Sequence, residues 1–325
     1  MILVIGESND VTCNIVSEYL YYLGANFKRV NGEDFTILEA FHLGNQKKTQ
    51  LTIGNEHILQ DICIVWHRRG TPRLMPLELR NSAYNVYGYL KKEEESILKS
   101  LEERFKAEAK YIGSYFDEIE NYKIQYLEIA MKAGLQIPET LITSSKKTLK
   151  KFLEQEVHVI CKDIRYPIHL YEGKKVWSSG GTFKFTTQIL DEMQDHFFPS
   201  LFQKMIFKEY EIRIFFFLDE LFSMAIFSQA DEKTRIDYRN YNVKKPNRNV
   251  PFQLPAEMDR KIRNFIRISK LTSGSIDLIV SPEQEYYFLE VNPQGQLDWL
   301  SKNCNYYIEE KIANYLNDYE VNNRT

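Results

Sequence analysis

The sequence predicts an α/β protein that folds as more than one domain. Its 325 residues exceed what one simple core usually holds. The apolar run over residues 1–6 predicts a buried strand, and residues 11–23 and 27–31 continue as a helix and a second strand. A strand, a helix and a strand in this order are typical of a small doubly wound parallel sheet.

The rest of the N-terminal part continues this alternation less regularly. Residues 36–59 predict short strands, and residues 61–66 predict the next buried strand. Arg68 and Arg69 follow that strand, at the carboxyl end where parallel sheets place binding sites. The two arginines could bind acidic side chains of a peptide substrate or of a neighbouring domain, or they could form a structural salt bridge. A long charged helix is expected over 78–110.

A second unit is expected to begin near residue 115. Apolar spacing, glycine stops and turn residues divide the remainder into elements. In order, these are a helix at 121–134, a strand at 137–142, a helix at 145–154, strands at 157–162 and over 168–186, a helix at 187–195, strands at 201–207, 211–218 and 221–227, a polar loop at 231–253, a helix at 255–271, a hairpin at 274–296 and a helix at 305–317.

Composition excludes several classes of function. The net charge is −3, and the 42 basic and 45 acidic residues are spread along the chain without a basic block. A general nucleic-acid or membrane-surface binder is therefore not expected. The four cysteines lie far apart and show neither zinc nor redox spacing, which favours a reducing cytoplasm. No apolar run approaches the length of a membrane span.

Oxygen-bearing side chains interrupt the apolar hairpin at 274–296. Asp277 lies in its first strand, Glu290 in its second, and Asn292 follows two residues later, on the same face as Glu290. Carboxylates crowded on neighbouring apolar strands repel each other unless a cation joins them. Mg²⁺ prefers such ligands and takes the others from water and phosphate, so the hairpin predicts a magnesium site.

Several cationic or flexible positions could bind phosphate. Lys162 ends a buried strand, where an anion must offset its desolvation, and that anion could be a phosphate or a structural carboxylate. Taken by itself, Lys123 is interpreted as a solvated surface lysine. Arg213 shares a strand face with Glu211, so it could clamp phosphate oxygens or form a cross-strand salt bridge. The glycines at 180–181 could cover phosphates or simply form a turn.

Together these motifs resemble those of the ATP-grasp superfamily, and most of all its graspetide synthetases, the ω-ester and ω-amide peptide ligases of the microviridin type. The motifs that carry the resemblance stand in the order of that group: Lys123, Lys162, the segment from Gln203 to Ile206, Glu211 with Arg213, Asp277, and Glu290 with Asn292. The glycines at 180–181 depart from the pattern, because they follow Lys162 later than is usual in the superfamily.

The resemblance implies an ATP-grasp fold of three parts. Residues 1–115 would form the small doubly wound α/β domain that precedes the ATP-grasp unit. Residues 116–203 would form the central ATP-grasp domain, and residues 204–325 the C-terminal one with the magnesium site. ATP would bind between the last two.

The resemblance also implies roles for single residues. Lys123 and Lys162 would contact ATP phosphates, Glu211 would lie near the ribose, and Arg213 near the γ-phosphate or the acyl phosphate. The adenine would pair with the backbone of an interdomain strand made of Gln203, Lys204, Met205 and Ile206. Mg²⁺ would bind Asp277, Glu290 and Asn292.

One further position lies on the acceptor side of the reaction. Arg239, in the polar loop, could orient the acceptor, although loop arginines are mostly solvated. The expected catalytic residues are Arg213, Lys162 and Arg239. No general base stands out in the sequence.

The implied reaction is ATP-dependent closure of rings in a ribosomal precursor peptide with a leader and a core. Asp or Glu carboxylates would become acyl phosphates and then join Thr or Ser hydroxyls as esters, or Lys amines as amides. A cytoplasmic homodimer is expected. Three other functions remain open: a ligase that adds a free amino acid to a carboxylate, a small-molecule kinase, and a nucleotide-binding module without catalysis.

Overall fold

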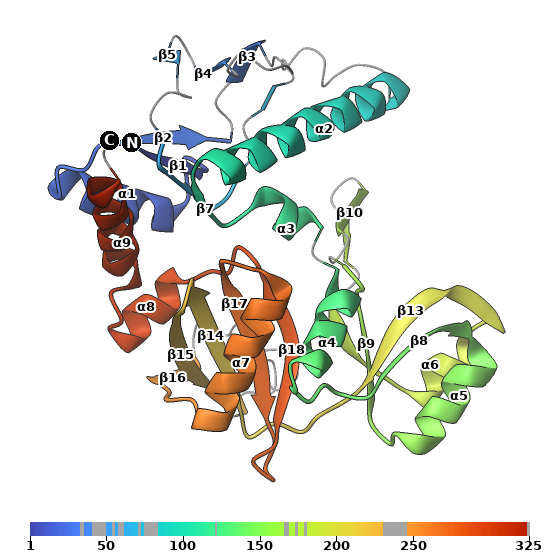
Figure 1. The fold of residues 1–325 in the computed structure, drawn as a ribbon. Helices are drawn as coiled ribbons and strands as arrows, with labels where there is room; N and C mark the ends of the chain where they lie inside the picture. The colour runs from blue at the N-terminus through green and yellow to red at the C-terminus, as the bar shows by residue number, and fades with distance from the viewer. Residues whose placement is uncertain are drawn as a thin grey trace.

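The computed structural model of the chain describes residues 1–32, 36–40, 50–53, 56–57, 62–70, 73–74, 84–120, 122–165, 169–172, 175–178, 181–229 and 246–323. It is a mixed α/β structure whose larger sheets each carry their own helices (Figure 1). None of the helices in the described ranges is both long and apolar enough to cross a membrane.

The N-terminal sheet is parallel throughout and runs in the order β2-β1-β6-β7. It consists of β1 (Ile2–Gly6), β2 (Phe27–Asn31), β6 (Ile64–His67) and β7 (Lys110–Ile112). A separate antiparallel sheet holds β3 (Thr36–Ala40), β4 (Gln50–Ile53) and β5 (Glu56–His57). The doubly wound opening that the sequence predicts is thus confirmed.

Helices cover both faces of the N-terminal sheet. Ile2 and Val4 of β1 belong to the same buried cluster as α1 (Val11–Tyr22), whereas Leu3 lies in the cluster of α2 (Tyr84–Glu108). This split follows from strand geometry, since successive side chains point to opposite faces. The Asp10 carboxylate caps α1 by accepting from the Cys13 N–H at 2.7 Å.

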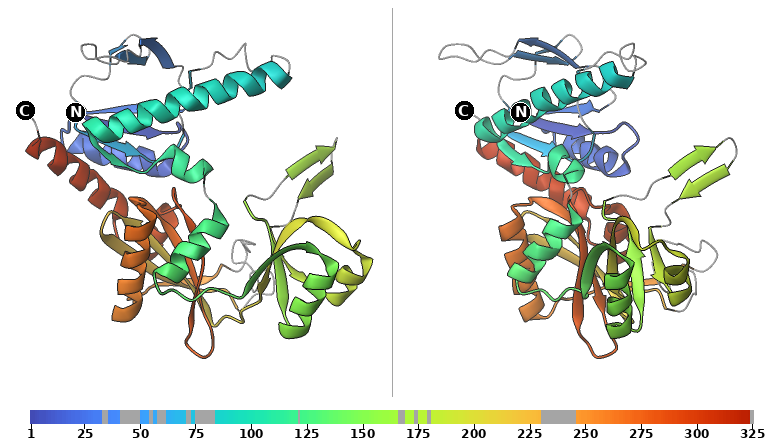
Figure 2. Two further views of the ribbon diagram at one scale, coloured as in Figure 1. Left: turned by 45° about the vertical axis from the view of Figure 1, so that its right-hand side comes forward. Right: turned by 90° about the vertical axis from the view of Figure 1, so that its right-hand side faces the viewer.

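The central sheet is antiparallel, in the order β12-β9-β13-β8. Its strands are β8 (Thr140–Ser145), β9 (Val159–Lys162), β12 (Thr182–Phe185) and β13 (His196–Lys204), and α5 (Lys146–Gln155) and α6 (Thr187–Glu192) cover it. The hairpin of β10 (His169–Glu172) and β11 (Lys175–Ser178) stands away from this sheet (Figure 2).

The C-terminal sheet is also antiparallel, in the order β16-β15-β14-β17-β18. Its strands are β14 (Tyr210–Phe217), β15 (Glu220–Phe227), β16 (Arg248–Pro251), β17 (Ser273–Val280) and β18 (Tyr286–Asn292). α7 (Ala256–Ser269) and α4 (Lys123–Lys132) pack together over it, and α4 contacts β18. α4 therefore precedes the central strands in sequence but lies on the C-terminal sheet.

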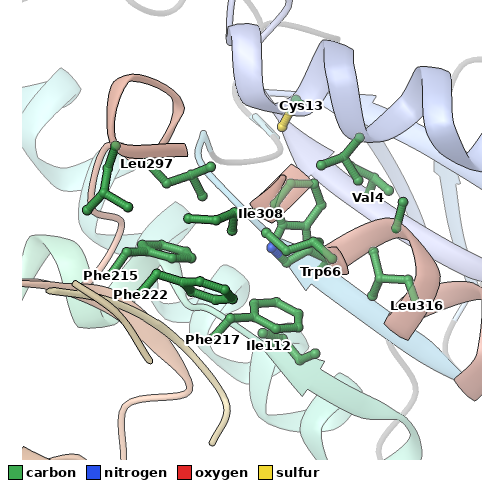
Figure 3. Packing of buried hydrophobic residues seen from close by; sticks show 14 of the residues in the cluster. Val4, Cys13, Trp66, Ile112, Phe215, Phe217, Phe222, Leu297, Ile308 and Leu316 are labelled. Atoms are coloured by element: carbon green, nitrogen blue, oxygen red, sulfur yellow. The ribbon is translucent and has the colours of Figure 1, made fainter. Parts of the chain in front are cut away.

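One hydrophobic core joins the N-terminal and C-terminal parts of the molecule. Val4 and Trp66 from the first sheet share a buried cluster with Phe215 and Phe222 from the last (Figure 3). α8 (Asp298–Cys304) and α9 (Ile308–Asn322) fill the space between them, and α9 packs along α1. The domain limits at residues 115 and 203 remain predictions, because sheets and helices mix across them.

The structure corrects several expected elements. α3 (Tyr115–Ile119), α8 and β16 were not predicted, and β13 ends at Lys204 rather than at residue 207. The last helix extends to Asn322 instead of ending at 317. Its end is held in place because Leu316 and Glu320 are buried, and the Glu320 carboxylate lies 3.7 Å from the amino terminus.

Candidate functional site

A cavity of about 290 Å³ lies between the central and C-terminal sheets. It collects residues that the sequence placed in the nucleotide and metal sites, although they come from distant parts of the chain. Eight of the predicted residues line it: Lys162, Gln203, Lys204, Met205, Ile206, Glu211, Asp277 and Glu290.

The central sheet forms one wall of the cavity, which we call the central wall: Ile160, Lys162, Thr182, Lys184 and Gln203. Strand register explains the grouping. Lys184 pairs with Ile160, Ile160 pairs with Gln203, and Thr182 pairs with Lys162. Residues paired across neighbouring antiparallel strands share a face of the sheet, so this face carries two lysines beside an apolar Ile160.

The segment after β13 leads from the central sheet to the C-terminal sheet. The backbone N–H groups of Lys204 and Met205 already donate to the carbonyls of Glu139 and His158, at 2.9 and 2.8 Å. A purine base therefore has to use the carbonyls of this segment or the N–H of Ile206. Of the backbone groups expected to pair with adenine, the N–H groups of Lys204 and Met205 are therefore not available.

Gln203 has an orientation that its neighbours determine. The Thr140 hydroxyl donates its only proton to the Pro138 carbonyl at 2.7 Å, so towards Gln203 it can only accept. The Gln203 amide NH₂ donates to that oxygen at 2.9 Å. The Oε1 atom of Gln203 is then an acceptor, and within the described part of the chain it has no hydrogen-bond partner although it is buried. An amino group on a ligand would satisfy it.

The C-terminal sheet forms the opposite wall, which we call the C-terminal wall: Glu211, Asp277, Ile279, Leu289 and Glu290. Asp277 of β17 lies directly opposite Glu290 of β18, and Asn292 lies opposite Ser275, one pair further along the same face. A bulge follows the pair of Asp277 and Glu290, where the register shifts. The predicted convergence of two carboxylates and one amide is therefore present in the strand register.

Each carboxylate of that pair has a basic partner. Nη1 of Arg213, opposite Asp277 on β14, lies 3.0 Å from both Asp277 oxygens. Nζ of Lys123, at the start of α4, lies 3.5 Å from Glu290 Oε2 and donates to the Asp163 carbonyl at 3.1 Å. Lys123 therefore links the carboxylate pair to the chain just after β9. Of the two interpretations for Arg213, the cross-strand ion pair is present, in the middle of the sheet and not at its edge.

Glu211 forms a second buried ion pair on the C-terminal wall. Its carboxylate accepts from Lys208 Nζ at 2.5 Å and from the Ser228 hydroxyl at 2.8 Å. Burial raises the pKa of Glu211, whereas Lys208 and Ser228 oppose that rise. Its two oxygens are thus engaged with the protein, which fixes the carboxylate beside the cavity.

The residues present fit Mg²⁺ and a nucleotide. Two opposed carboxylates and an amide leave further positions for water and phosphate, as Mg²⁺ requires. Among the described residues, no group of three or more His, Cys, Asp or Glu side chains could hold a metal ion. Lysines on the central wall suit phosphates, and the buried Oε1 of Gln203 suits a base amino group.

Other predicted residues lie outside the cavity lining. Lys123 and Arg213 were expected at the ATP phosphates, but they contact Glu290 and Asp277 and are not part of the lining. Asn292 lies beyond Glu290 on β18. Arg239 and Gly180 fall outside the described residues, while Gly181 lies just before β12.

Sequence reasoning missed Thr182, Lys184 and Lys208. A single polar residue on a strand or linker gives no spacing signal. The alternation of Lys184 with Thr182 after the glycines was the only available sign.

Comparison with known proteins identifies related families and folds. The family model of the RimK-like ATP-grasp domain matches residues 120–316, which is more than half of the chain. No curated protein matched the sequence.

Solved structures match over nearly the whole chain. A RiPP-associated ATP-grasp ligase from Chryseobacterium gregarium, in complex with ADP and a leader and core peptide, is 26% identical with a TM-score of 0.82, covering 100% of this chain and 97% of that one. The macrocyclase MdnC from Microcystis aeruginosa MRC, bound with precursor peptide MdnA, is 25% identical with a TM-score of 0.79, covering 97% and 99%. The ATP-grasp ligase PsnB, complexed with minimal precursor, Mg and ADP, shares the fold at 16% identity, a TM-score of 0.76 and coverage of 98% and 97%.

Proposed function

The chain belongs to the RimK-like ATP-grasp family, and we propose that it closes rings in a ribosomal precursor peptide by joining side chains. It is an ATP-grasp ligase, with ATP and Mg²⁺ as its cofactors, and the predicted fold class is confirmed. Asp or Glu carboxylates of the peptide are activated and then joined to Thr or Ser hydroxyls, or to Lys amines. Esters and amides need the same activation, so both products remain within the proposal.

The observation that carries this proposal is the opposition of two charged walls across one cavity. Lys162 and Lys184 stand on the central wall, and Asp277 and Glu290 on the C-terminal wall. Transfer of a phosphoryl group to a carboxylate brings two anions together, so it needs cations around both. Similarity over the whole chain to a ligase described with ADP and a leader and core peptide supports the peptide as substrate.

When bound, ATP supplies the phosphoryl group that turns a carboxylate into an acyl phosphate, and Mg²⁺ offsets the charge on the transferred group. Lys162 holds phosphate oxygens from the central wall. Asp277, Glu290 and Asn292 hold the metal from the other. Arg213 stays on Asp277 and fixes the orientation of that ligand through a two-oxygen contact, while Lys123 steadies Glu290.

The base is held at the other end of the cavity. Oε1 of Gln203 accepts from the exocyclic amino group of adenine, and the segment that ends in Ile206 pairs with the ring edge. Ile160 on one wall and Leu289 on the other supply apolar contact. Glu211, fixed by Lys208 and Ser228, lies where a ribose hydroxyl can donate to it.

We propose further that the partner peptide carries a leader and a core, that the enzyme works as a homodimer, and that it acts in the cytoplasm. The peptide assignment is supported by MdnC, described as a macrocyclase bound with its precursor peptide. The four cysteines are all free thiols, which supports a reducing compartment. Arg239 keeps its proposed role of orienting the acceptor.

Mass spectrometry of the peptide tests the proposal. The protein is incubated with ATP, Mg²⁺ and a short peptide encoded beside its gene that is rich in Thr or Ser and in Asp or Glu. We expect the peptide to lose one water for each link formed, because carboxylate and hydroxyl or amine condense. Hydroxide treatment then separates esters, which hydrolyse, from amides, which persist.

Three other results would contradict the proposed function. A mass gain equal to an added amino acid, when free amino acids are supplied, would indicate a ligase of the second kind. A gain of phosphate that persists would indicate a kinase. An unchanged peptide together with unchanged ATP, at a peptide concentration where binding is measured, would contradict the proposed substrate.

A further inference from the structure

Arg68 connects the N-terminal sheet to the predicted magnesium site. It follows β6 directly and is buried, with 5% of its surface exposed. Its guanidinium Nη1 donates to the backbone carbonyl of Gln294, a residue 226 positions away in the chain. Gln294 follows Asn292 by two residues, so this contact reaches the end of β18 where the third proposed metal ligand lies.

The loop that carries Arg68 is held rigidly from its own side. The Arg68 N–H donates to the Ile5 carbonyl at 2.9 Å. Nε2 of His67 lies 2.5 Å from the Gly70 carbonyl, and since a carbonyl only accepts, that nitrogen carries the proton. Gly70 has φ +76°, and a Cβ there would lie 2.6 Å from the Gly6 carbonyl oxygen, so glycine is required.

The charge of Arg68 is offset by a carboxylate at the start of α1. Asp10, the cap of α1, places Oδ2 3.9 Å from Arg68 Nε and 3.7 Å from Arg69 Nε. The two arginines differ in the groups that they contact. The Arg68 side chain reaches the Gln294 carbonyl, whereas the more exposed Arg69 side chain lies near Asp10, and the Arg69 N–H donates to the Ile5 carbonyl at 3.4 Å.

The turn after β18 is fixed on its opposite side as well. The Gly295 N–H donates to the Asn292 carbonyl at 2.9 Å, which closes a tight turn around Pro293 and Gln294. A Cβ on Gly295 would lie 2.1 Å from Ser275 Oγ, so the turn presses directly against β17. With β17 on one side and Arg68 on the other, the turn that starts at Asn292 has little freedom.

We propose that Arg68 is a positioning residue for the metal site: its hydrogen bond to the Gln294 carbonyl sets the orientation of Asn292 towards Mg²⁺. This inference rests on the metal ligands of the proposed function. Residues that orient metal ligands commonly change metal affinity by about 10- to 100-fold when they are replaced. Arg68 would act without touching metal, nucleotide or peptide.

The test measures Mn²⁺ binding to the full-length protein with saturating ADP by electron paramagnetic resonance, so turnover is not needed. Mn²⁺ is the probe because it accepts the same oxygen ligands as Mg²⁺. We expect Asn292→Ala and Arg68→Gln each to raise the Kd for Mn²⁺ about tenfold. If Arg68 acts through Asn292, the double variant binds no more weakly than Asn292→Ala alone.

Arg69→Gln is the matched control, since it removes the same charge beside Asp10 and leaves the Gln294 contact intact. It should keep the Kd for Mn²⁺ within about twofold of the parent protein, far below the tenfold change expected of a positioning residue. If Arg68→Gln does not fold, Asp10→Asn/Arg68→Met removes both buried charges, and asparagine still caps α1.

The outcomes separate this inference from the proposed function. An unchanged Kd in Asn292→Ala overturns the metal ligands and this role together. A weakened Kd in Asn292→Ala with an unchanged Kd in Arg68→Gln overturns only the role of Arg68. Additive losses in the double variant, or an equal loss in Arg69→Gln, would also overturn it, because both results indicate a general effect of charge or folding.

Discussion

The two walls of the cavity carry opposite charges and secure them differently. On the C-terminal wall, each carboxylate is tied to a basic residue of the protein: Asp277 to Arg213, Glu290 to Lys123 and Glu211 to Lys208. On the central wall, Lys162 is half-buried and Lys184 is exposed, on strands that border the cavity. The carboxylates of the C-terminal wall are therefore held in ion pairs, two of them buried, whereas the lysines of the central wall are more exposed and border the space that a ligand would fill.

This difference predicts that stability and ligand binding separate between the walls. Removing one partner of a buried ion pair leaves an uncompensated charge and costs roughly 3–5 kcal/mol. Removing a charge that is partly in solvent costs far less. Substitutions in the buried ion pairs of the C-terminal wall should affect folding and chemistry together, and substitutions on the central wall should mainly affect nucleotide binding.

The largest effect on activity is expected from Glu290→Gln. The change keeps the size of the side chain but removes a metal-ligand charge, so we expect peptide-dependent ADP release to fall by at least about 100-fold. Circular dichroism should show a folded protein, because Glu290 is only half-buried. Glu283→Gln, at an exposed position on the same hairpin, should retain full ADP release. Normal turnover by Glu290→Gln would contradict the metal assignment.

Arg213→Met should produce the largest loss of stability. It leaves the Asp277 carboxylate without the guanidinium that contacts both of its oxygens, so urea unfolding should show a loss of roughly 3–5 kcal/mol. Asp277→Asn in the same chain should restore much of this loss by removing the stranded charge. A change below about 1 kcal/mol in Arg213→Met would place this pair among weak surface contacts and remove the contrast between the walls.

Lys162→Met tests the central wall, where nucleotide binding should change and stability should not. We expect the KM for ATP to rise about tenfold, in line with the loss of one charge-assisted hydrogen bond to phosphate. The free energy of unfolding should change by less than about 1 kcal/mol. Lys150→Met, an exposed position on α5, is the matched control and should change neither quantity. A large loss of stability without a change in KM would assign Lys162 to the fold.

The smallest effect is expected from Gln203→Leu, which removes an acceptor while keeping an apolar side chain of similar size. ADP binding, measured by calorimetry, should weaken about fivefold, the value of one hydrogen bond of about 1 kcal/mol. GDP offers an acceptor where adenine offers an amino group, so its affinity should not fall. An equal loss of affinity for ADP and GDP would show that Gln203 does not distinguish adenine from guanine.

The sequence predicted the parts of the site that depend on local pattern. Strand alternation and the intervening turn placed Asp277 and Glu290 on one hairpin, and the structure pairs them directly. The parallel opening of the chain followed from the same kind of pattern. Both succeeded because period and turn chemistry act over a few residues.

Long-range packing was not accessible in this way. Lys123 reads as a surface lysine until α4 is seen to pack on β18, which brings its ammonium to Glu290. Arg213 could not be assigned between phosphate and carboxylate without the register of β14 with β17. The Arg68 contact with Gln294 depends on the core shared by the first and last sheets, and apolar pattern alone does not say which sheets share a core.

The central claim is that this cavity activates a substrate carboxylate by phosphoryl transfer. The most direct test uses precursor peptide whose Asp and Glu carboxylates carry ¹⁸O, incubated with the enzyme, Mg²⁺ and unlabelled ATP. The carboxylate oxygen that attacks the γ-phosphorus leaves with phosphate when the hydroxyl or amine takes its place. We therefore expect one ¹⁸O in each phosphate released per link. Phosphate that stays unlabelled while the link forms would contradict the account.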